Sequence, residues 1–227
     1  MKMIRRSGPY RTRTVPRGGP IGYGGKGATP PPPGVFYQFD GLSMNATMAT
    51  NWLPTTPAFN IRVTTVFKFV QPGDQWLVSN GGSSQGLVAR ATTNLFTGRI
   101  NTGAVVNMTS PVEAQVDTVY ELHLRCAVGD NAMVVNGQSS PVTPGTSSIT
   151  LPVNRLGGST TTNGLTGYMG FLELEDVASP ANTVYFPMNE GAGDTFFAYE
   201  ADRVTPKPAF NATIIGFNAL SWQVITA

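Results

Sequence analysis

The feature that most constrains the fold is a period-two alternation of apolar and polar side chains over residues 59–69. The odd positions carry apolar or β-branched residues, while Asn60, Arg62, Thr64 and Lys68 occupy the opposite face. Successive side chains of a β-strand point to opposite faces, so this pattern predicts a long, half-buried strand. An amphipathic helix would instead repeat its apolar residues every three to four positions.

The same alternation recurs over residues 118–126, where Tyr120, Leu122 and Leu124 are interleaved with Glu121 and His123. Shorter apolar runs elsewhere in the chain indicate further strands. These strand candidates lie at 36–40, 75–80, 86–92, 95–101, 131–136, 148–152, 166–174, 183–187, 209–215 and 221–225. Turn-forming stretches rich in Gly, Pro, Asn and Asp separate many of them, including 71–74, 81–84, 129–131 and 136–137.

The composition supports an all-β fold. Charged residues make up 12% of the chain, well below the roughly 25% of ordinary soluble domains, and 26 Gly and 18 Pro stand among 227 residues. Helical bundles and coiled coils need more Ala, Glu, Lys and Leu than this, and no window shows a sustained helical period. Many short strands with frequent turns predict an antiparallel sandwich or jelly roll.

The single cysteine, Cys126, excludes an intramolecular disulfide and is compatible with folding in a reducing cytoplasm. No apolar run is long enough for a secretory signal or a spanning helix. We therefore expect a soluble protein with no membrane partner.

Residues 1–34 differ from the rest of the chain in composition and charge. They hold seven of the 15 basic residues and no acidic one, so residues 35–227 carry eight basic and 13 acidic residues. Their many Gly and Pro residues leave too little apolar surface to offset the entropy of ordering the chain. We expect an extended N-terminal arm over 1–34, with a polyproline II spacer at Pro30–Pro33, and one sandwich domain over 35–227.

The arm carries the strongest functional signal, because its positive charges and tyrosines suit an acidic surface. The predicted partner-binding residues of the arm are Arg5, Arg6, Tyr10, Arg11, Arg13, Arg17, Tyr23 and Lys26. The surface could belong to another protein or to a nucleic acid, with protein the preferred interpretation. A solvated leader without a partner is the alternative.

Short stretches with a shared order and spacing run through the domain. They are an aromatic-Asp-Gly turn at 39–44, the long strand at 60–70, a Val-Asn-Gly hairpin at 134–137, a Leu-Gly-Gly turn at 155–158 and a strand containing Gly-Tyr-Met-Gly at 165–176. Together they resemble the laminin-G-like, concanavalin-A-like jelly rolls found in bacteriophage and bacterial modular proteins. Residues 189–194 and Trp222 are similar to the tail of phage-type members. The departures are Tyr120, where Trp is common, and Asn136, where Asp is common.

The resemblance implies a fold that hosts lectins, glycanases, adhesion modules and structural virion parts. Glycanases of this superfamily place three carboxylates on one strand, and the nearest candidate is Glu173-Leu174-Glu175-Asp176. Glu173 and Glu175 would share a face, but Asp176 would point away, so we expect no enzyme. His123, the only histidine, and Cys126 would lie on opposite faces of one strand, which disfavours nucleophilic catalysis.

A few loop and aromatic residues are candidates for binding calcium or a glycan. Asp40, Asp130, Asn131 and Asn136 could offer oxygen ligands to calcium, but turn formation explains them more simply, so no cofactor is expected. Trp52 and Trp76 are the candidates for stacking against a sugar, whereas core packing is the competing interpretation. Trp222 is expected in the core.

The sequence therefore favours a bacteriophage virion structural protein, specifically a capsid decoration protein. Its arm would anchor it to neighbouring capsid or tail proteins after assembly in the host cytoplasm, and homo-oligomers are expected. The alternative is a glycan-binding receptor module of a tail fibre or a cell-surface protein.

Overall fold

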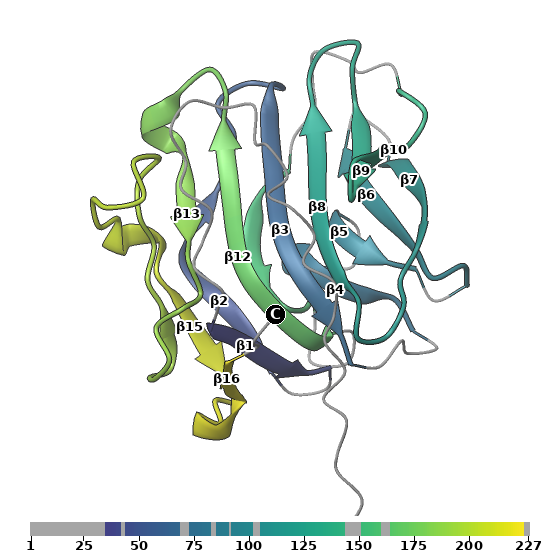
Figure 1. Ribbon diagram of the computed structural model, residues 1–227. Coiled ribbons are helices and arrows are strands. Elements are labelled where there is room, and N and C mark those ends of the chain that lie inside the picture. The colour runs from purple at the N-terminus through teal and green to yellow at the C-terminus, as the bar shows by residue number, and fades with distance from the viewer. Residues whose placement is uncertain are drawn as a thin grey trace, which may run out of the picture.

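The computed structural model describes residues 35–41, 44–68, 73–82, 85–90, 92–101, 105–143, 151–159 and 164–224. Its regular elements are strands and three short 3-10 helices, and the described residues contain no α-helix. The strands form two antiparallel sheets packed face to face (Figure 1), which confirms the predicted all-β sandwich. The expected arm over 1–34 lies outside the described residues.

The front sheet, which faces the viewer in Figure 1, has the strand order β10-β9-β8-β3-β12-β1-β16, with β13 also paired to β12. Its strands are β1 (Val35–Asp40), β3 (Phe59–Phe67), β8 (Val119–Cys126), β9 (Ala132–Val135), β10 (Gln138–Ser139), β12 (Thr166–Asp176), β13 (Val184–Phe186) and β16 (Trp222–Val224). Neighbours in the sheet are often distant in sequence, so most of its pairings are long-range.

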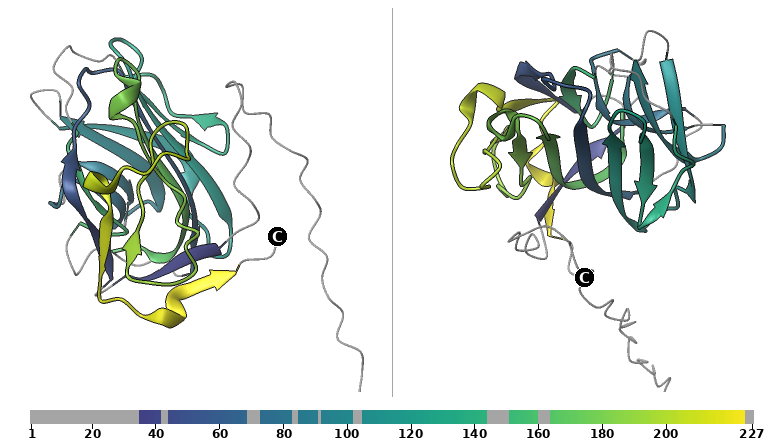
Figure 2. Two further views of the ribbon diagram at one scale, coloured as in Figure 1. Left: turned by 90° about the vertical axis from the view of Figure 1, so that its left-hand side faces the viewer. Right: turned by 90° about the horizontal axis from the view of Figure 1, so that it is seen from above.

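The back sheet has the order β14-β15-β2-β11-β4-β5-β6-β7. Its strands are β2 (Asn45–Trp52), β4 (Gln75–Ser79), β5 (Gly86–Ala89), β6 (Leu95–Asn101), β7 (Val105–Glu113), β11 (Val153–Leu156), β14 (Thr195–Phe196) and β15 (Ala212–Ile215). The 3-10 helices are η1 (Pro180–Asn182), η2 (Pro208–Phe210) and η3 (Ala219–Ser221). Figure 2 shows the two layers from the side and from above.

The predicted alternation in the long strand is confirmed by β3. Phe59, Ile61, Val63 and Phe67 are buried in the core between the sheets, while Arg62 is partly exposed on the outer face. The neighbouring antiparallel strands β8 and β12 have the same inner and outer faces as β3. On the outer face, Arg62 lies opposite His123 of β8 on one side and Glu173 of β12 on the other. The outer face of the front sheet is therefore polar along its middle.

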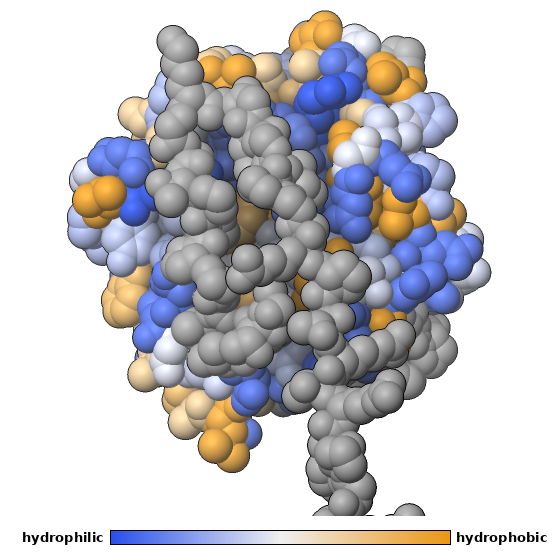
Figure 3. Space-filling view, viewed as in Figure 1, coloured by the Kyte–Doolittle hydropathy of each residue, from blue (hydrophilic) through white to orange (hydrophobic). Residues whose placement is uncertain are grey.

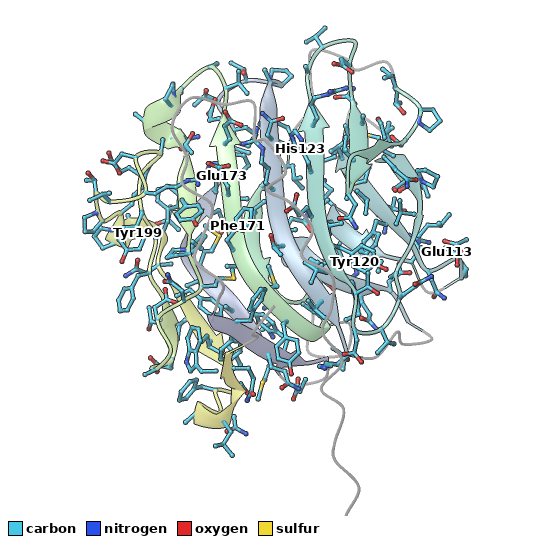
Figure 4. All side chains as sticks on the ribbon, viewed as in Figure 1. Glu113, Tyr120, His123, Phe171, Glu173 and Tyr199 are labelled. Carbon is cyan, nitrogen blue, oxygen red and sulfur yellow. The ribbon has the colours of Figure 1, made fainter. Side chains whose placement is uncertain are left out.

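Aromatic rings fill two parts of the core. At one end, Tyr37 makes edge contacts with Phe196 and Trp222, with ring centroids 5.3 and 5.0 Å apart. Further along the sandwich, Phe96 lies 4.7 Å from Tyr120. The Tyr120 hydroxyl donates to the carbonyl of residue 113 and accepts from the amide of residue 115, so it also ties β7 to β8 (Figure 4).

Five strands were not predicted from the sequence: β2, β7, β10, β11 and β14. In β2 the residues are mostly Asn, Ala and Thr, which give a weak strand signal. In β7, Pro111 interrupts the pattern; the strand tolerates it because β7 is an edge strand with a register shift beside that position. Of the candidate at 148–152, residues 148–150 lie outside the described residues, residues 151 and 152 are not in a strand, and β11 begins at Val153.

The predicted Asn136-Gly137 turn is confirmed between β9 and β10. Asn136 has φ of 48° and Gly137 has φ of 81°, which is the left-handed backbone that tight hairpins require. The Asn136 side chain also accepts a 2.8 Å hydrogen bond from the Glu121 amide. This explains how Asn can replace the Asp that is common here in the resembling family.

Residues 187–221, which we call the C-terminal segment, are built differently from the sheets. They contain two short strands, β14 and β15, and the helices η2 and η3, joined by turns. Side-chain caps hold these turns: Asp202 accepts from the amides of Val204 and Thr205, and Asn211 accepts from the Ala198 amide.

Candidate functional site

The outer face of the front sheet carries a connected group of polar side chains from three adjacent strands and one loop. We call it the front-sheet cluster. Its members are Asn60 and Arg62 on β3, His123 on β8, Glu173 and Glu175 on β12, and Arg203 in the C-terminal segment. Figure 4 shows His123 and Glu173 at similar heights on this face, with Phe171 below Glu173 on the same strand.

Arg62 is the centre of the cluster. Its guanidinium lies 2.8 Å from Glu173 Oε2 and 2.8 Å from Glu175 Oε2. Arg203 pairs with the other oxygen of Glu173 at 3.2 Å. The Glu173 side chain is only 10% exposed, so two guanidinium groups compensate a largely desolvated carboxylate. The Arg62 and Glu175 side chains keep about a third of their surface exposed, which leaves them available to a ligand.

Asn60 links His123 to the carboxylates. Its Nδ2 donates to Glu175 Oε2 over 2.8 Å, and its Oδ1 lies 3.0 Å from His123 Nε2. A carbonyl oxygen only accepts, so this arrangement assigns the imidazole proton to Nε2. Burial, followed by the positive charges of Arg62 and Arg125, lowers the pKa of His123 to about 4. The ring is therefore neutral at pH 7.

Two aromatic rings lie beside the cluster, that of Phe171 on β12 and that of Tyr185 on β13, which is opposite Glu173. Tyr185 and Phe171 lie with ring centroids 6.1 Å apart, and the Arg203 guanidinium lies 4.6 Å from the Tyr185 centroid. Both rings are mostly covered, so polar groups rather than aromatic faces dominate the accessible surface here.

The three carboxylates at 173–176 do not form the row that a glycanase of this type uses. Glu173 and Glu175 share the outer face, as predicted, but both are held by Arg62. Asp176 points elsewhere: it accepts hydrogen bonds from the amides of Thr55 and Ser179 and from the Asn182 side chain. Asp176 therefore organises loops at the strand end.

His123 and Cys126 lie on opposite faces of β8, as expected. Cys126 is buried in the core, and burial raises the pKa of its thiol, which keeps it protonated and unreactive.

The residues considered for calcium are engaged within their own turns. Asp40 accepts from the Met44 amide, Asp130 pairs with Arg125, and Asn131 bonds to both Ala127 and Thr143. Among the described residues, no group of three or more His, Cys, Asp or Glu is placed to hold a metal ion.

The prediction that Trp52 and Trp76 stack against a sugar is wrong for this structure. Both side chains are 0% exposed. Trp52 packs on Phe59 with centroids 5.9 Å apart and donates from Nε1 to the Asn182 carbonyl, so it closes the core. Arg99 lies over the ring of Trp76. The competing interpretation, core packing of large aromatic residues, accounts for both. Trp222 packs against the core as expected.

The predicted partner-binding residues of the arm, from Arg5 to Lys26, lie outside the described residues, and so their contacts stay a prediction. The described helices are three-residue turns, and none of them has the length and apolarity needed to cross a membrane.

A second feature of the surface lies in the C-terminal segment, where a hollow of about 410 Å³ is lined by Phe197, Ala198, Tyr199, Pro206, Pro208 and Asn211. We call it the C-terminal hollow. Apolar side chains are exposed around it and along the same segment, including Phe197 at 46% and Leu220 at 79%. Figure 3 shows hydrophobic residues at the left edge and lower left of the molecule, on the side where Figure 1 places β15 and β16.

No protein-family model and no curated protein sequence matches the chain. Solved structures do match its fold. A carbohydrate-binding protein, so described, from Bacteroides ovatus superposes with a TM-score of 0.54 at 9% identity, over 82% of this chain and 61% of that one. A heptameric SAP-like pentraxin from Limulus polyphemus matches with a TM-score of 0.47 at 12% identity, over 63% of this chain and 76% of that one.

The fold is an antiparallel jelly-roll sandwich. The chain spans less than two thirds of the Bacteroides ovatus protein, and an identity this low establishes the fold alone.

Sequence reasoning missed both surface features. The polar face of β3 and the shared face of Glu173 and Glu175 were recognised, but their pairing depends on the register of β12 against β3. Arg203 joins from 30 residues further along the chain. The only available signal was the complementary charge of Arg62 on one strand and of Glu173 and Glu175 on another.

Proposed function

We propose that this chain is a non-enzymatic binding module that recognises glycans through the front-sheet cluster. The observation that carries the proposal is the connected row of planar polar groups running from Asn60 through Glu175, Arg62 and Glu173 to Arg203. Neighbouring hydroxyls of a sugar act as both donors and acceptors. Such a row offers amide, carboxylate and guanidinium partners in fixed positions.

The proposal extends to how the module binds. The neighbouring rings of Phe171 and Tyr185 are largely covered, so hydrogen bonds rather than stacking supply most of the binding energy. Hydrogen bonds exchanged with water contribute modestly to net binding. Single-site affinity is then weak, and several copies binding together supply the strength.

The test is a glycan array with the full chain, followed by calorimetry on any sugar bound, with competition by the free sugar. Glu175→Gln keeps the shape of the side chain but removes its charge, and we expect at least about tenfold weaker binding. Glu113→Gln is the matched control, because Glu113 is exposed at the end of β7 in the other sheet. Absence of any bound glycan, or equal affinity of the two variants, would overturn the proposal.

A second function is favoured by the charge of the arm. Seven basic and no acidic residues in 1–34, against a net excess of acidic residues in 35–227, support anchoring to an acidic protein surface. We propose on this basis a bacteriophage virion structural protein, such as a capsid decoration protein, located in the particle beside capsid or tail proteins. Nucleic acid is the less favoured partner of the arm.

Deleting residues 1–34 should abolish incorporation into particles while leaving the sandwich folded. Replacing the five arginines of the arm by Ser should weaken incorporation, and salt raised from about 0.05 to 0.5 M should weaken the unmodified chain, because exposed ion pairs are screened. A steep logarithmic dependence of DNA or RNA binding on salt would instead identify nucleic acid as the partner. If the chain that lacks residues 1–34 is incorporated into particles at normal occupancy, the proposal that the arm anchors the protein is refuted.

A further inference from the structure

The C-terminal hollow combines proline and aromatic side chains in one concave surface. Phe197 and Tyr199 come from one stretch of the C-terminal segment, and Pro206 and Pro208 come from the returning stretch. Asn211 adds an amide at the edge. Ligand sites in proteins commonly have this character, a concave and mainly apolar surface with a few polar groups.

Hydrogen bonds between the two stretches fix the walls of the hollow. Lys207 donates its amide to the Ala198 carbonyl over 2.7 Å, and the Ala198 amide donates to Asn211 Oδ1 over 2.9 Å. Tyr199 also pairs in both directions with Tyr185, which joins the hollow to the front sheet. The hollow is therefore built into the fold and need not be ordered by a ligand.

The chemistry of these walls fits a polyproline II segment. Such a segment has three residues per turn, and its backbone carbonyls make no internal hydrogen bonds. Its prolines pack against aromatic rings in shallow grooves, and the free carbonyls accept from nearby hydroxyl or amide donors. Tyr199 and Asn211 supply these two donor types beside the apolar wall.

The same chain carries such a segment, Pro30–Pro33, within a basic arm. Charge complementarity favours it as the occupant. Residues 189–211, which lead into and line the hollow, contain four acidic residues, Glu190, Asp194, Glu200 and Asp202, and two basic ones, Arg203 and Lys207, so they carry a net negative charge. Arg203 pairs with Glu173, and the Lys207 ammonium donates to the Thr183 carbonyl. Lys26 lies four positions before Pro30, and the other six basic residues of the arm precede it.

The Pro30–Pro33 segment that fills the hollow is more readily supplied by a second copy of the chain than by the same copy. Only Gly34 separates Pro33 from β1, which is held between β12 and β16 in the front sheet. A polyproline run is stiff over several residues, so it does not turn back onto its own sandwich within one residue. A neighbouring molecule has no such restriction.

We propose that the C-terminal hollow binds the Pro30–Pro33 segment of a second copy of this chain. Each molecule then offers one arm and one hollow, so contacts run head to tail and generate rings or open filaments. This inference is independent of glycan binding. It shares with the virion proposal only the idea that the arm is an assembly segment, and it names a different partner.

Sedimentation velocity over a concentration series of the full chain tests the proposal. The unmodified chain should form oligomers, and a peptide of residues 22–35 should disperse them, whereas the same peptide with Ala at 30–33 should not. Phe197→Ala in the hollow and the double change Pro31→Ala/Pro32→Ala in the arm should each weaken association by at least about tenfold. Leu220→Ala is the matched control, because this residue is exposed in the same segment but does not line the hollow.

Mixing the two defective variants gives a sharper result. Phe197→Ala keeps a working arm, and the double proline variant keeps a working hollow, so together they should form dimers and nothing larger. Circular dichroism of each variant checks that the fold is retained. A full chain that stays monomeric, or oligomers that withstand the proline changes, would overturn the inference. If the chain is monomeric but still joins particles, the inference about the hollow is overturned and the virion proposal is not.

Discussion

The central strands of the front sheet and the C-terminal segment use apolar side chains in opposite ways. In β3, every core-facing apolar residue from Phe59 to Phe67 is buried, and the ladder with β12 runs over nearly the whole strand. In the C-terminal segment, the strands β14 and β15 span two and four residues, and Phe197, Val204 and Leu220 are exposed. The C-terminal segment thus buries some apolar residues, such as Phe196 and Ile214, but leaves others on the surface, whereas β3 buries all of its core-facing ones.

The difference follows from how each region satisfies its backbone. A ladder of strands pairs amides and carbonyls while its inner side chains leave water together. The C-terminal segment combines short-range backbone hydrogen bonds with side-chain caps from residues such as Asp202 and Asn218, and each cap satisfies only one or two groups. Such a segment holds its shape without needing to bury every apolar group.

The largest expected effect tests the buried side of this comparison. Phe67→Ala should lower the free energy of unfolding by about 3–5 kcal/mol, because it removes a fully buried ring that packs on Phe96. Lys68→Ala, at the next and exposed position, should change it by less than about 0.5 kcal/mol. Denaturant unfolding measures both values, and equal effects would show that the strand register is wrong.

A smaller loss is expected at the end of β12. Asp176→Ala should destabilise the fold by about 1–3 kcal/mol, since it removes a buried carboxylate and leaves the partly buried donors of Thr55, Ser179 and Asn182 without their acceptor. Asp117→Ala is the control, because Asp117 pairs with Lys68 at an exposed position. Thermal unfolding of the two variants should separate them clearly; similar midpoints would remove the structural role given to Asp176.

The polar side of the front sheet predicts a dependence on pH. The pKa of His123 is about 4 in the folded chain and near 6.5 when unfolded, so the unfolded chain takes up a proton first as pH falls. The stability contributed by the neutral ring is present above about pH 6.5 and is lost between about pH 6.5 and 4.

We expect a loss of about 1–2 kcal/mol between pH 7 and 4.5 from this group, after allowance for partial exposure to solvent. His123→Gln, which retains a side-chain donor toward Asn60, should flatten this part of the pH profile. Urea unfolding at a series of pH values provides the measurement. An unchanged slope in the variant would assign the dependence to other groups.

The smallest effect is expected in the C-terminal segment. Leu220→Ala should alter the free energy of unfolding by less than about 0.5 kcal/mol, because the side chain is 79% exposed. A loss of several kcal/mol, measured in the same denaturant series as Phe67→Ala, would contradict the contrast between the two regions.

The sequence predicted those parts of the fold whose signal is local. The alternation in β3 and β8 and the Asn136-Gly137 turn arise from side-chain period and backbone preference, which neighbouring residues determine. By contrast, β2 has no such signal: its Asn and Ala residues are held by pairing with β11 and β15, which are distant in sequence.

The candidate site was predictable only in pieces. That Glu173 and Glu175 share a face follows from period two, whereas the position of Arg62 between them requires the register of two strands more than 100 residues apart. The burial of Trp52 and Trp76 could not be predicted, because the residue type alone does not distinguish a buried ring from an exposed one.

Pro111 in β7 also bears on how copies of the chain can meet. Four of the edge strands among the described residues, β10, β13, β14 and β16, are only two or three residues long. A further edge strand, β7, spans nine residues but carries a proline that cannot donate a hydrogen bond to an added strand. The molecule therefore resists joining its neighbours edge to edge into a continuous sheet. A crowded population of such chains is protected from amyloid-like stacking, and any ordered contact between them must be made by side chains or by segments outside the sandwich.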